Sequence, residues 1–323
     1  MEIINGIERF PQTGRPLCLA LGNFDGVHRG HQVIIRNTVQ QARACGGVSA
    51  ALIFDPHPII TLYPQRPFSL ITDLADRAEV LRELGLDYLI IEQFGSDKAA
   101  LSAELFIRTI LVGRLKAKSI FVGTDYSFGH KGSGTAETMR AWGEKYGYSV
   151  TTTSTITRNG KKISSSIIRA LVLSGEVDEA AELLDYYFFR QGKVVRGYGI
   201  GSKIVYPTAN VKAGKRLIWP GKGVYLTAVG KINKTLHFGV TNVGSRPTFA
   251  HHGMSVETHI LNFNGTLYNR ELRLYFLEKI RETRAFPSAA ILKEQIAKDI
   301  DRAQERIGSY QDAGGDLPKY IGL

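Results

Sequence analysis

The densest set of residues capable of chemistry lies near the start of the chain, in "GNFDGVHRGH" at positions 22–31. Two histidines three positions apart could bind zinc from one helix face, but zinc needs a third protein ligand, and no cysteine or metalloprotease-type glutamate accompanies them. Glycines let backbone approach a ligand closely, and a helix that begins after Gly30 presents free N–H groups to phosphate. The stretch therefore favours a phosphate cradle over a metal site. The candidate residues of this cradle are Gly22, Asp25, Gly26, His28, Gly30 and His31.

Two residue types of the cradle also have ordinary structural uses. Histidines often stand at helix starts without any chemical role, and Asp25 could be a turn residue or a group that positions magnesium. The stretch by itself does not decide whether the histidines and Asp25 have a chemical or a purely structural role.

A second candidate site lies in "GKVVRGYGIGSKIVYPTANV", residues 192–211. Its glycines Gly197, Gly199 and Gly201 predict a flexible loop over nucleotide phosphates, although glycine-rich turns are common between strands. In the "PTAN" segment that follows, Thr208 and Asn210 are two positions apart, so on a strand both side chains point to the same face. Hydroxyl and amide oxygens of this kind suit Mg²⁺ when phosphates and water complete the coordination.

The elements around the first site indicate an α/β fold. Over residues 1–185, apolar strand-like runs at 17–21, 49–54, 87–91, 119–123 and 148–153 alternate with helical patterns at 31–44, 73–85 and 102–115. Asp73 and Ser102 are expected N-caps, with Gly85 as a stop signal. This alternation predicts a doubly wound parallel sheet covered on both faces. Ligands bind beyond the carboxyl ends of such strands, where the cradle lies.

The pattern changes after about residue 185. Residues 223–244 and 256–280 each read as two strands around a turn, at Asn233 and at Asn264-Gly265 respectively. Alternating strands without intervening helices predict an antiparallel barrel or sandwich, against which an amphipathic helix at 288–307 would pack. We therefore expect two domains, 1–185 and 186–323.

Composition limits the class of protein. The 323 residues are 43% hydrophobic and 22% charged, as in soluble globular proteins, and no apolar run is long enough to cross a bilayer. No secretory signal opens the chain, and Cys18 and Cys45 form no metal-type pair, so a cytoplasmic location is expected. The net charge of +11 indicates anionic partners. Without an RNA-binding signature, we expect phosphorylated small molecules rather than nucleic acid.

The cradle resembles the HxGH-type signature of nucleotidyltransferases. "FDPHP" (54–58), "VGTDYSFGHKGSG" (122–134) and "ISSSIIR" (163–169) follow it in the order seen in the adenylyltransferase half of bacterial bifunctional FAD synthetases. The resemblance implies that FMN attacks the α-phosphate of ATP and releases pyrophosphate. By the resemblance, His28 and His31 bind the ATP phosphates. Ser164 and Ser165 contact phosphate or cap the helix that follows, and Arg169 binds the leaving pyrophosphate.

The flavin ring would need an apolar slot. The resemblance and the aromatic character of these motifs suggest a set of lining residues, although aromatic side chains are more often core. The expected flavin contacts in this half are Phe54, Pro56, Pro58, Asp125 and Phe128.

The second half resembles riboflavin kinase, through the "PTAN" element after a glycine-rich loop. "GVYLTAV" (223–229), "GVTNVGSRPTF" (239–249) and residues 256–282 continue that resemblance in order. By this likeness Thr208 and Asn210 coordinate magnesium, and Glu257 accepts the proton of the riboflavin 5′-hydroxyl. Asn242 and Arg246 are expected flavin contacts.

Together the two likenesses imply a bifunctional enzyme that converts riboflavin to FMN and FMN to FAD, with ATP as co-substrate, Mg²⁺ as cofactor and weak self-association. Some motif positions depart from the family. Ser166 and Ile167 stand where Thr and Arg are usual, and Tyr126 and Ser127 where Phe and Arg are usual. Val205 and Arg196 likewise replace a common Gly and His in the kinase half. One alternative is therefore a kinase with a weakened transferase, and another is a flavin- or RNA-binding regulator.

Overall fold

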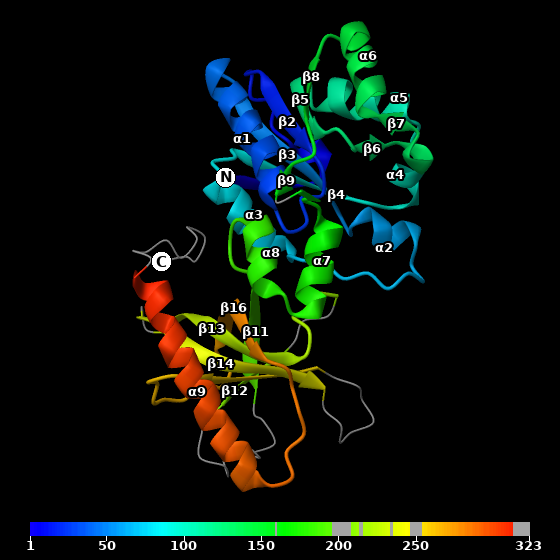
Figure 1. Cartoon of the computed structure of the whole chain (residues 1–323). Helices are drawn as coiled ribbons and strands as arrows, with labels where there is room; N and C mark the ends of the chain where they lie inside the picture. The colour runs from blue at the N-terminus through cyan, green and yellow to red at the C-terminus, as the bar shows by residue number, and fades with distance from the viewer. Residues whose placement is uncertain (159, 196–207, 213–215, 233–234, 246–253, 313–323) are drawn as a thin grey trace. The chain divides into compact units, whose positions relative to one another are not determined.

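The computed structural model describes residues 1–158, 160–195, 208–212, 216–232, 235–245 and 254–312. The chain divides into two compact units, Met1–Ser165 and Ser166–Leu323 (Figure 1). The division falls at the start of α7 (Ser165–Ser174), so α7 and α8 (Val177–Leu184), which lie within the predicted first domain 1–185, group with the second unit. Contacts with the second unit explain this grouping: Gly221 N–H donates to the Val172 carbonyl, and α8 packs on a barrel strand, β16.

The first unit is built on a six-stranded sheet in the order β1-β4-β3-β2-β5-β8, and every neighbouring pair is parallel. This arrangement confirms the predicted parallel sheet. The strands are β1 (Glu2–Asn5), β2 (Leu17–Leu21), β3 (Val48–Asp55), β4 (Tyr88–Gln93), β5 (Ala117–Gly123) and β8 (Ser149–Thr153).

Both faces of the central strand β2 are covered, as predicted, because all five of its residues are buried. Leu17, Leu19 and Leu21 point into the core cluster that a π-helix, η2 (Phe106–Arg114), also enters. Helix α1 (Arg29–Ala44) packs on β2, β3 and β5. Two further helices are α3 (Leu74–Glu83) and α6 (Ala136–Tyr146).

The expected helix caps are present. The Asp73 carboxylate accepts the Asp76 N–H at 2.8 Å, and the Ser102 hydroxyl oxygen accepts the Leu105 N–H at 3.2 Å. Gly85, with φ +84°, follows the end of α3 in the left-handed region that favours glycine. The short elements of this unit are η1 (Ile7–Arg9), α2 (Pro58–Leu62), α4 (Ser96–Ala100), α5 (Ala103–Leu105), β6 (Ser127–Phe128), η3 (His130–Gly132), β7 (Gly134–Thr135), β9 (Thr157–Arg158) and β10 (Lys161–Lys162).

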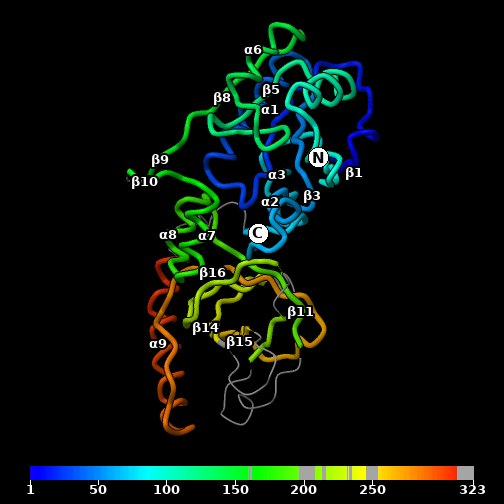
Figure 2. The backbone as a smooth tube through the Cα atoms, turned by 90° about the vertical axis from the view of Figure 1, so that its right-hand side faces the viewer, coloured from blue at the N-terminus to red at the C-terminus, as the bar shows by residue number. Residues whose placement is uncertain are grey.

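The second unit contains a closed antiparallel barrel in the order β11-β12-β15-β14-β13-β16, followed by α9 (Ala289–Asp312). Figure 2 shows α9 alongside the barrel. Barrel and C-terminal helix agree with the prediction, and closure settles the choice between barrel and sandwich. The strands are β11 (Phe189–Val195), β12 (Ala209–Val211), β13 (Gly223–Ile232), β14 (Thr235–Ser245), β15 (Met254–Ile260) and β16 (Glu271–Arg281).

Only one of the two predicted hairpins pairs with itself. Strands β13 and β14 are neighbours, with the predicted turn at Asn233 outside the described residues. The prediction was wrong for 256–280, because β15 pairs with β12 and β14, whereas β16 pairs with β11 and β13. The segment between β15 and β16 is a long connection across the barrel rather than a tight turn. Within the part of the chain that is described, no helix combines the length and apolar character needed to cross a membrane.

Candidate active sites

The cradle lies at the carboxyl end of β2 and leads directly into α1. Its backbone is unusual, because Phe24, Gly26 and Val27 all have positive φ, at +49°, +81° and +35°. A β-branched residue in that region costs about 1–3 kcal/mol, and such strain persists where packing enforces it. Phe24 and Val27 are 1% and 0% exposed, so the core holds both in place. Strain of this kind concentrates at ligand-binding loops.

His28 is the N-cap of α1, and its Nδ1 accepts the backbone N–H of His31 at 3.4 Å. An Nδ1 that accepts carries no proton, so in the neutral ring the hydrogen is on Nε2. The two imidazoles stack with centroids 3.6 Å apart, and the His31 ring meets Phe24 edge-on. His28 thus presents a ring donor at the start of a helix whose first N–H groups also attract anions.

Metal binding by these histidines finds no support in the surrounding side chains. Among the residues that the structure describes, no group of three or more His, Cys, Asp or Glu is close enough to hold a metal ion. The phosphate interpretation of the cradle stays a prediction.

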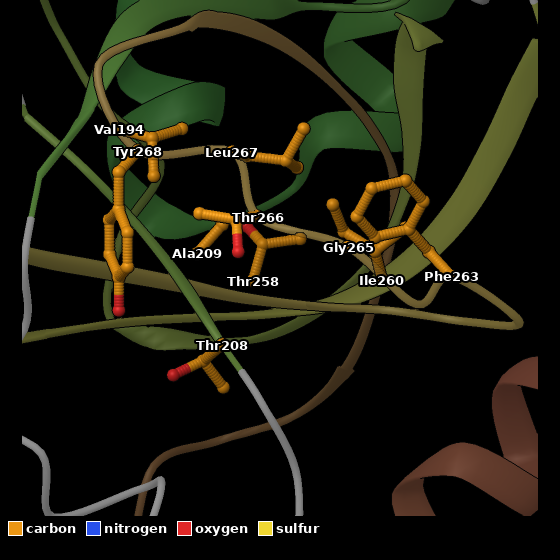
Figure 3. A pocket seen from close by; sticks show the side chains of 10 residues that line it. All are labelled: Val194, Thr208, Ala209, Thr258, Ile260, Phe263, Gly265, Thr266, Leu267 and Tyr268. Atoms are coloured by element: carbon orange, nitrogen blue, oxygen red, sulfur yellow. The ribbon is translucent and has the colours of Figure 1, made fainter. Parts of the chain in front are cut away.

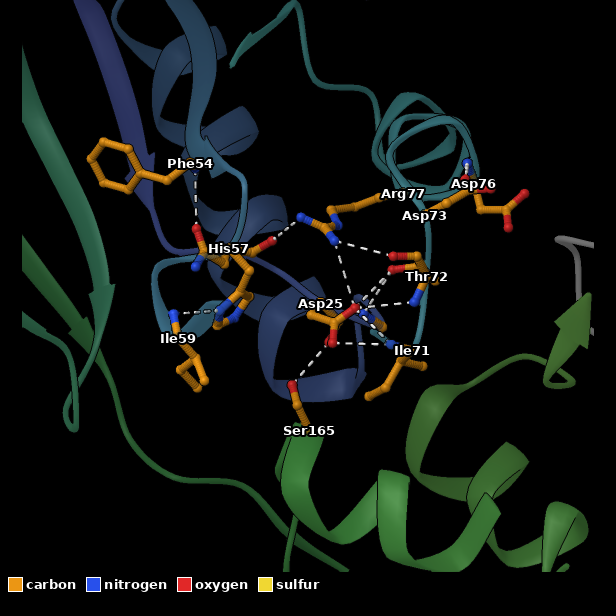
Figure 4. Close-up of polar contacts among 12 residues, drawn as sticks. Asp25, Phe54, His57, Ile59, Ile71, Thr72, Asp73, Asp76, Arg77 and Ser165 are labelled. Carbon is orange, nitrogen blue, oxygen red and sulfur yellow. Dashed lines mark hydrogen bonds and ion pairs between the residues drawn. The ribbon is translucent and has the colours of Figure 1, made fainter. Parts of the chain in front are cut away.

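The Asp25 carboxylate is committed to protein donors (Figure 4). It accepts the backbone N–H groups of Ile71 and Thr72 at 3.0 Å, and the Arg77 guanidinium lies 3.6 Å away. Asp25 and Arg77 are only 2% and 3% exposed. Arg77 also donates to the carbonyl of Asn23. These contacts favour a structural role for Asp25 over magnesium binding, because the carboxylate fastens the cradle to the segment that precedes α3.

At two cradle glycines a side chain would be placed in tight contact with its neighbours. A Cβ on Gly26 would approach Ile71 to 3.0 Å, and its φ of +81° is itself unfavourable for other residues. A Cβ on Gly30 would lie 3.1 Å from the His28 ring. Gly26 therefore lets the loop pack closely against Ile71, and Gly30 lets it pack closely against the His28 ring.

The serine motif reaches the cradle through Ser165, whose hydroxyl donates to the backbone carbonyl of Asp25 at 2.9 Å (Figure 4). Ser165 is the first residue of α7, and Ser164 immediately precedes the helix. Arg169 lies one turn further along α7, in the second compact unit. The structure thus connects one of the two predicted serines to the predicted phosphate loop.

An aromatic row connects two predicted flavin residues that are far apart in the sequence. Phe106 lies between Phe54 and Phe128, with ring centroids 6.5 Å and 5.7 Å away. Tyr126 stacks on Phe128 at 5.8 Å, and Phe94 meets Phe54 edge-on at 5.2 Å. Helix η2 places Phe106 in this row, a residue that sequence reasoning assigned only to a helix.

The other predicted flavin residues of the first unit are closer to the surface. Pro58 begins α2, and Pro56 lies two residues before it; both are partly exposed. The Asp125 carboxylate forms an exposed ion pair with Lys162 at 3.2 Å.

In the second unit, register brings Asn210, Glu257 and Asn242 side by side. Glu257 on β15 is directly opposite Asn210 on β12 and Asn242 on β14. We call these three residues the barrel row. Directly opposed residues place their side chains on the same face of a sheet, about 4.5–5.5 Å apart at Cβ. The Ser255 hydroxyl, which sequence reasoning missed, donates to Glu257 Oε1 at 2.8 Å.

The opposite face of the same strands carries a chain of buried threonine hydroxyls. Thr258 and Thr241 are 2.9 Å apart, Thr241 and Thr227 are 2.8 Å apart, and Thr227 donates to the Gly239 carbonyl. All three side chains are fully buried. Since neighbouring residues of a strand point to opposite faces, the hydroxyl chain fixes the barrel row on the other face.

Thr208, which precedes β12, lines a pocket of about 190 Å³ (Figure 3). Its other lining residues are Val194, Ala209, Thr258, Ile260, Phe263, Gly265, Thr266, Leu267 and Tyr268. The predicted loop glycines Gly197, Gly199 and Gly201, and Arg246, lie outside the described residues.

Comparison with known proteins gives one match for each half of the chain. A family model described as FAD synthetase matches residues 11–167, and one described as riboflavin kinase matches residues 184–307.

Similar whole proteins are also known. An Escherichia coli K12 protein described as a bifunctional riboflavin kinase/FMN adenylyltransferase is 34% identical over 95% of this chain and 98% of its own. A Listeria monocytogenes protein with the same description is 33% identical over 87% of this chain and 89% of its own. A solved structure from Streptococcus pneumoniae, described as a macrolide-efflux protein, has 30% identity and a TM-score of 0.87, covering 94% of this chain and 99% of that one.

Proposed function

Because the chain belongs to the family of bifunctional riboflavin kinase/FMN adenylyltransferases, we propose that it makes FMN from riboflavin and ATP, and then FAD from FMN and a second ATP. We assign adenylyl transfer to residues 1–185 and phosphorylation to residues 186–323. The observation that carries the proposal is the barrel row, because the register aligns two predicted kinase residues with a predicted flavin contact from three separate strands.

In the kinase step, Glu257 accepts the proton of the riboflavin 5′-hydroxyl while that oxygen attacks the γ-phosphorus of ATP and ADP leaves. The Ser255 hydroxyl donates to Oε1 and so orients the carboxylate. Thr208, Asn210 and Glu257 offer oxygen donors, the type that Mg²⁺ prefers, and Thr208 and Asn210 would hold the ion. Bound magnesium would neutralise phosphate charge.

In the transferase step, a phosphate oxygen of FMN attacks the α-phosphorus of ATP, and the bond to the β-phosphate breaks to release pyrophosphate. No protein nucleophile is required, so positioning and charge stabilisation carry the catalysis. The His28 Nε2–H and the first N–H groups of α1 would donate to the phosphate oxygens, with His31 beside them. We assign Ser164 and Arg169 to the pyrophosphate, and the surroundings of Phe54 and Phe128 to the flavin ring.

We propose a cytoplasmic enzyme, which suits its ATP requirement and unpaired cysteines, with at most weak self-association.

A second candidate function, kinase alone, is favoured by one specific feature. Ile167 and Ser127 stand where arginines are usual in the family, and each lost charge-assisted contact to an anion is worth about 1.5–3 kcal/mol.

A time course with the purified chain, riboflavin, ATP and Mg²⁺ tests the proposal, with the flavins separated by chromatography. We expect FMN first and FAD afterwards. FMN that accumulates without FAD, even with FMN and ATP in excess, would favour the kinase-only function. No conversion at all, together with RNA binding that weakens steeply with salt, would favour the regulator.

A further inference from the structure

The only two cysteines of the 323 residues lie in contact with each other. Cys18 on β2 and Cys45 at the C-cap of α1 are 27 residues apart in the sequence, yet their sulfur atoms are 3.9 Å apart. The fold explains the approach. Leu17 and Leu19 point into the core cluster on one face of the sheet, so Cys18 between them points to the other face, which α1 covers.

The two thiols differ sharply in access. Cys18 is 0% exposed, whereas Cys45 is exposed. Burial, reinforced by the neighbouring Cys45, raises the pKa of the Cys18 thiol to about 12. An oxidant in solution therefore meets Cys45 first, and Cys18 can react only with a group that Cys45 brings to it.

The surroundings of Cys45 allow the two sulfur atoms to approach. A disulfide needs an S–S distance of about 2.05 Å, and thiols already in contact require only a small shift. Cys45 ends its helix and is followed by Gly46 with φ +63°, so side chain and helix end can adjust. Arg15 donates to the carbonyls of Gly46 and Gly47.

We propose that Cys18 and Cys45 are a redox-active pair that closes into an intramolecular disulfide when the chain meets a peroxide. Hydrogen peroxide first oxidises the Cys45 thiol to a sulfenic acid and releases one water. The Cys18 sulfur then attacks the Cys45 sulfur, the S–O bond breaks, and the hydroxide leaves with the Cys18 proton as a second water. The two thiols give up two electrons in total, and peroxide accepts them. This inference does not depend on the proposed function.

The disulfide would join the start of β2 to the end of α1. The cradle joins the end of β2 to the start of α1, so the disulfide would close a covalent loop from Cys18 to Cys45 that contains the cradle. Closing a loop restricts the unfolded chain. We therefore expect the oxidised first unit to unfold at a higher temperature than the reduced one.

Mass spectrometry of the full chain tests the proposal directly. The reduced protein is exposed to hydrogen peroxide and then denatured in N-ethylmaleimide, which labels every free thiol. We expect two labels before oxidation. After oxidation we expect a monomer with no label, about 2 Da lighter than the unlabelled reduced chain, that dithiothreitol reverses. Two persistent labels, a disulfide-linked dimer, or an over-oxidised Cys45 beside a free Cys18 would each overturn the proposal.

Two variants test the order of events. In Cys45→Ser, Cys18 should stay a free thiol during the same peroxide exposure, because it is buried, and N-ethylmaleimide should label it after denaturation. In Cys18→Ala, Cys45 should stop at a sulfenic acid that dimedone traps. If Cys18 in Cys45→Ser is oxidised as fast as in the natural chain, the order is wrong. Because the first measurement uses the natural chain, the test does not depend on either variant folding.

Discussion

The cradle and the barrel row are two proposed active-site regions that the chain assembles in opposite ways. Every predicted residue of the cradle lies within ten positions, on one strand-to-helix turn. The barrel row takes residues from three strands, and Asn210 and Glu257 are 47 positions apart. The first site is therefore fixed mainly by local backbone geometry, and the second by strand register. A slip of one residue in register would turn a barrel-row side chain to the other face.

The cradle nevertheless depends on one long-range clamp, and removing it should produce the largest loss of stability. We expect Asp25→Ala to destabilise the first unit by about 3–5 kcal/mol, because the buried N–H groups of Ile71 and Thr72 lose their acceptor and the buried ion pair with Arg77 is broken. FAD formation should fall while the barrel stays folded. Urea unfolding of the variant measures the effect.

Asp125→Ala is the matched control, since it removes the same side chain from an exposed ion pair with Lys162. Its expected cost is about 0–1 kcal/mol. Equal destabilisation by the two substitutions would show that the cradle is held by its local turn alone.

The sequence predicts the locally encoded features of the molecule well and its long-range contacts poorly. Local signals located five strands of the parallel sheet, the caps at Asp73 and Ser102, and the cradle before α1, but they missed the edge strand β1 (Glu2–Asn5). No local signal marks the partners of Asp25, because Ile71, Thr72 and Arg77 lie 46–52 positions away, and Arg77 resembles an ordinary surface residue of an amphipathic helix. The Asn264-Gly265 pair was misleading, because its turn chemistry does not reveal which strands close a barrel.

The role of register can be tested with Thr241→Val, which removes the central hydroxyl of the buried threonine chain without changing its shape. Thr227 and Thr258 would each lose a partner, so we expect a cost of about 1–3 kcal/mol to the second unit and slower FMN formation. Thermal unfolding and the FMN rate provide the measurements. Thr235→Val, at an exposed threonine of the same strand, is the control. If Thr241→Val forms FMN as fast as the natural chain, backbone pairing alone fixes the register.

A smaller effect is expected at Ser255, for which we propose an action through Glu257 alone. Ser255→Ala removes one hydrogen bond to the carboxylate, worth about 1 kcal/mol, or roughly a fivefold decrease in the kinase kcat. Conversion of supplied FMN to FAD by the same preparation is the internal control and should be unchanged. An unchanged kinase rate would remove Ser255 from the site.

The most direct test of two separate sites on one chain is a crossed pair of substitutions, His28→Ala and Glu257→Gln, each measured with riboflavin and with FMN. We expect Glu257→Gln to slow FMN formation by about 10²–10⁴-fold and still convert supplied FMN to FAD. His28→Ala should form FMN normally and stop there. If either substitution slows both reactions to the same extent, or if Glu257→Gln leaves FMN formation intact, the assignment of the cradle and the barrel row to different reactions is contradicted.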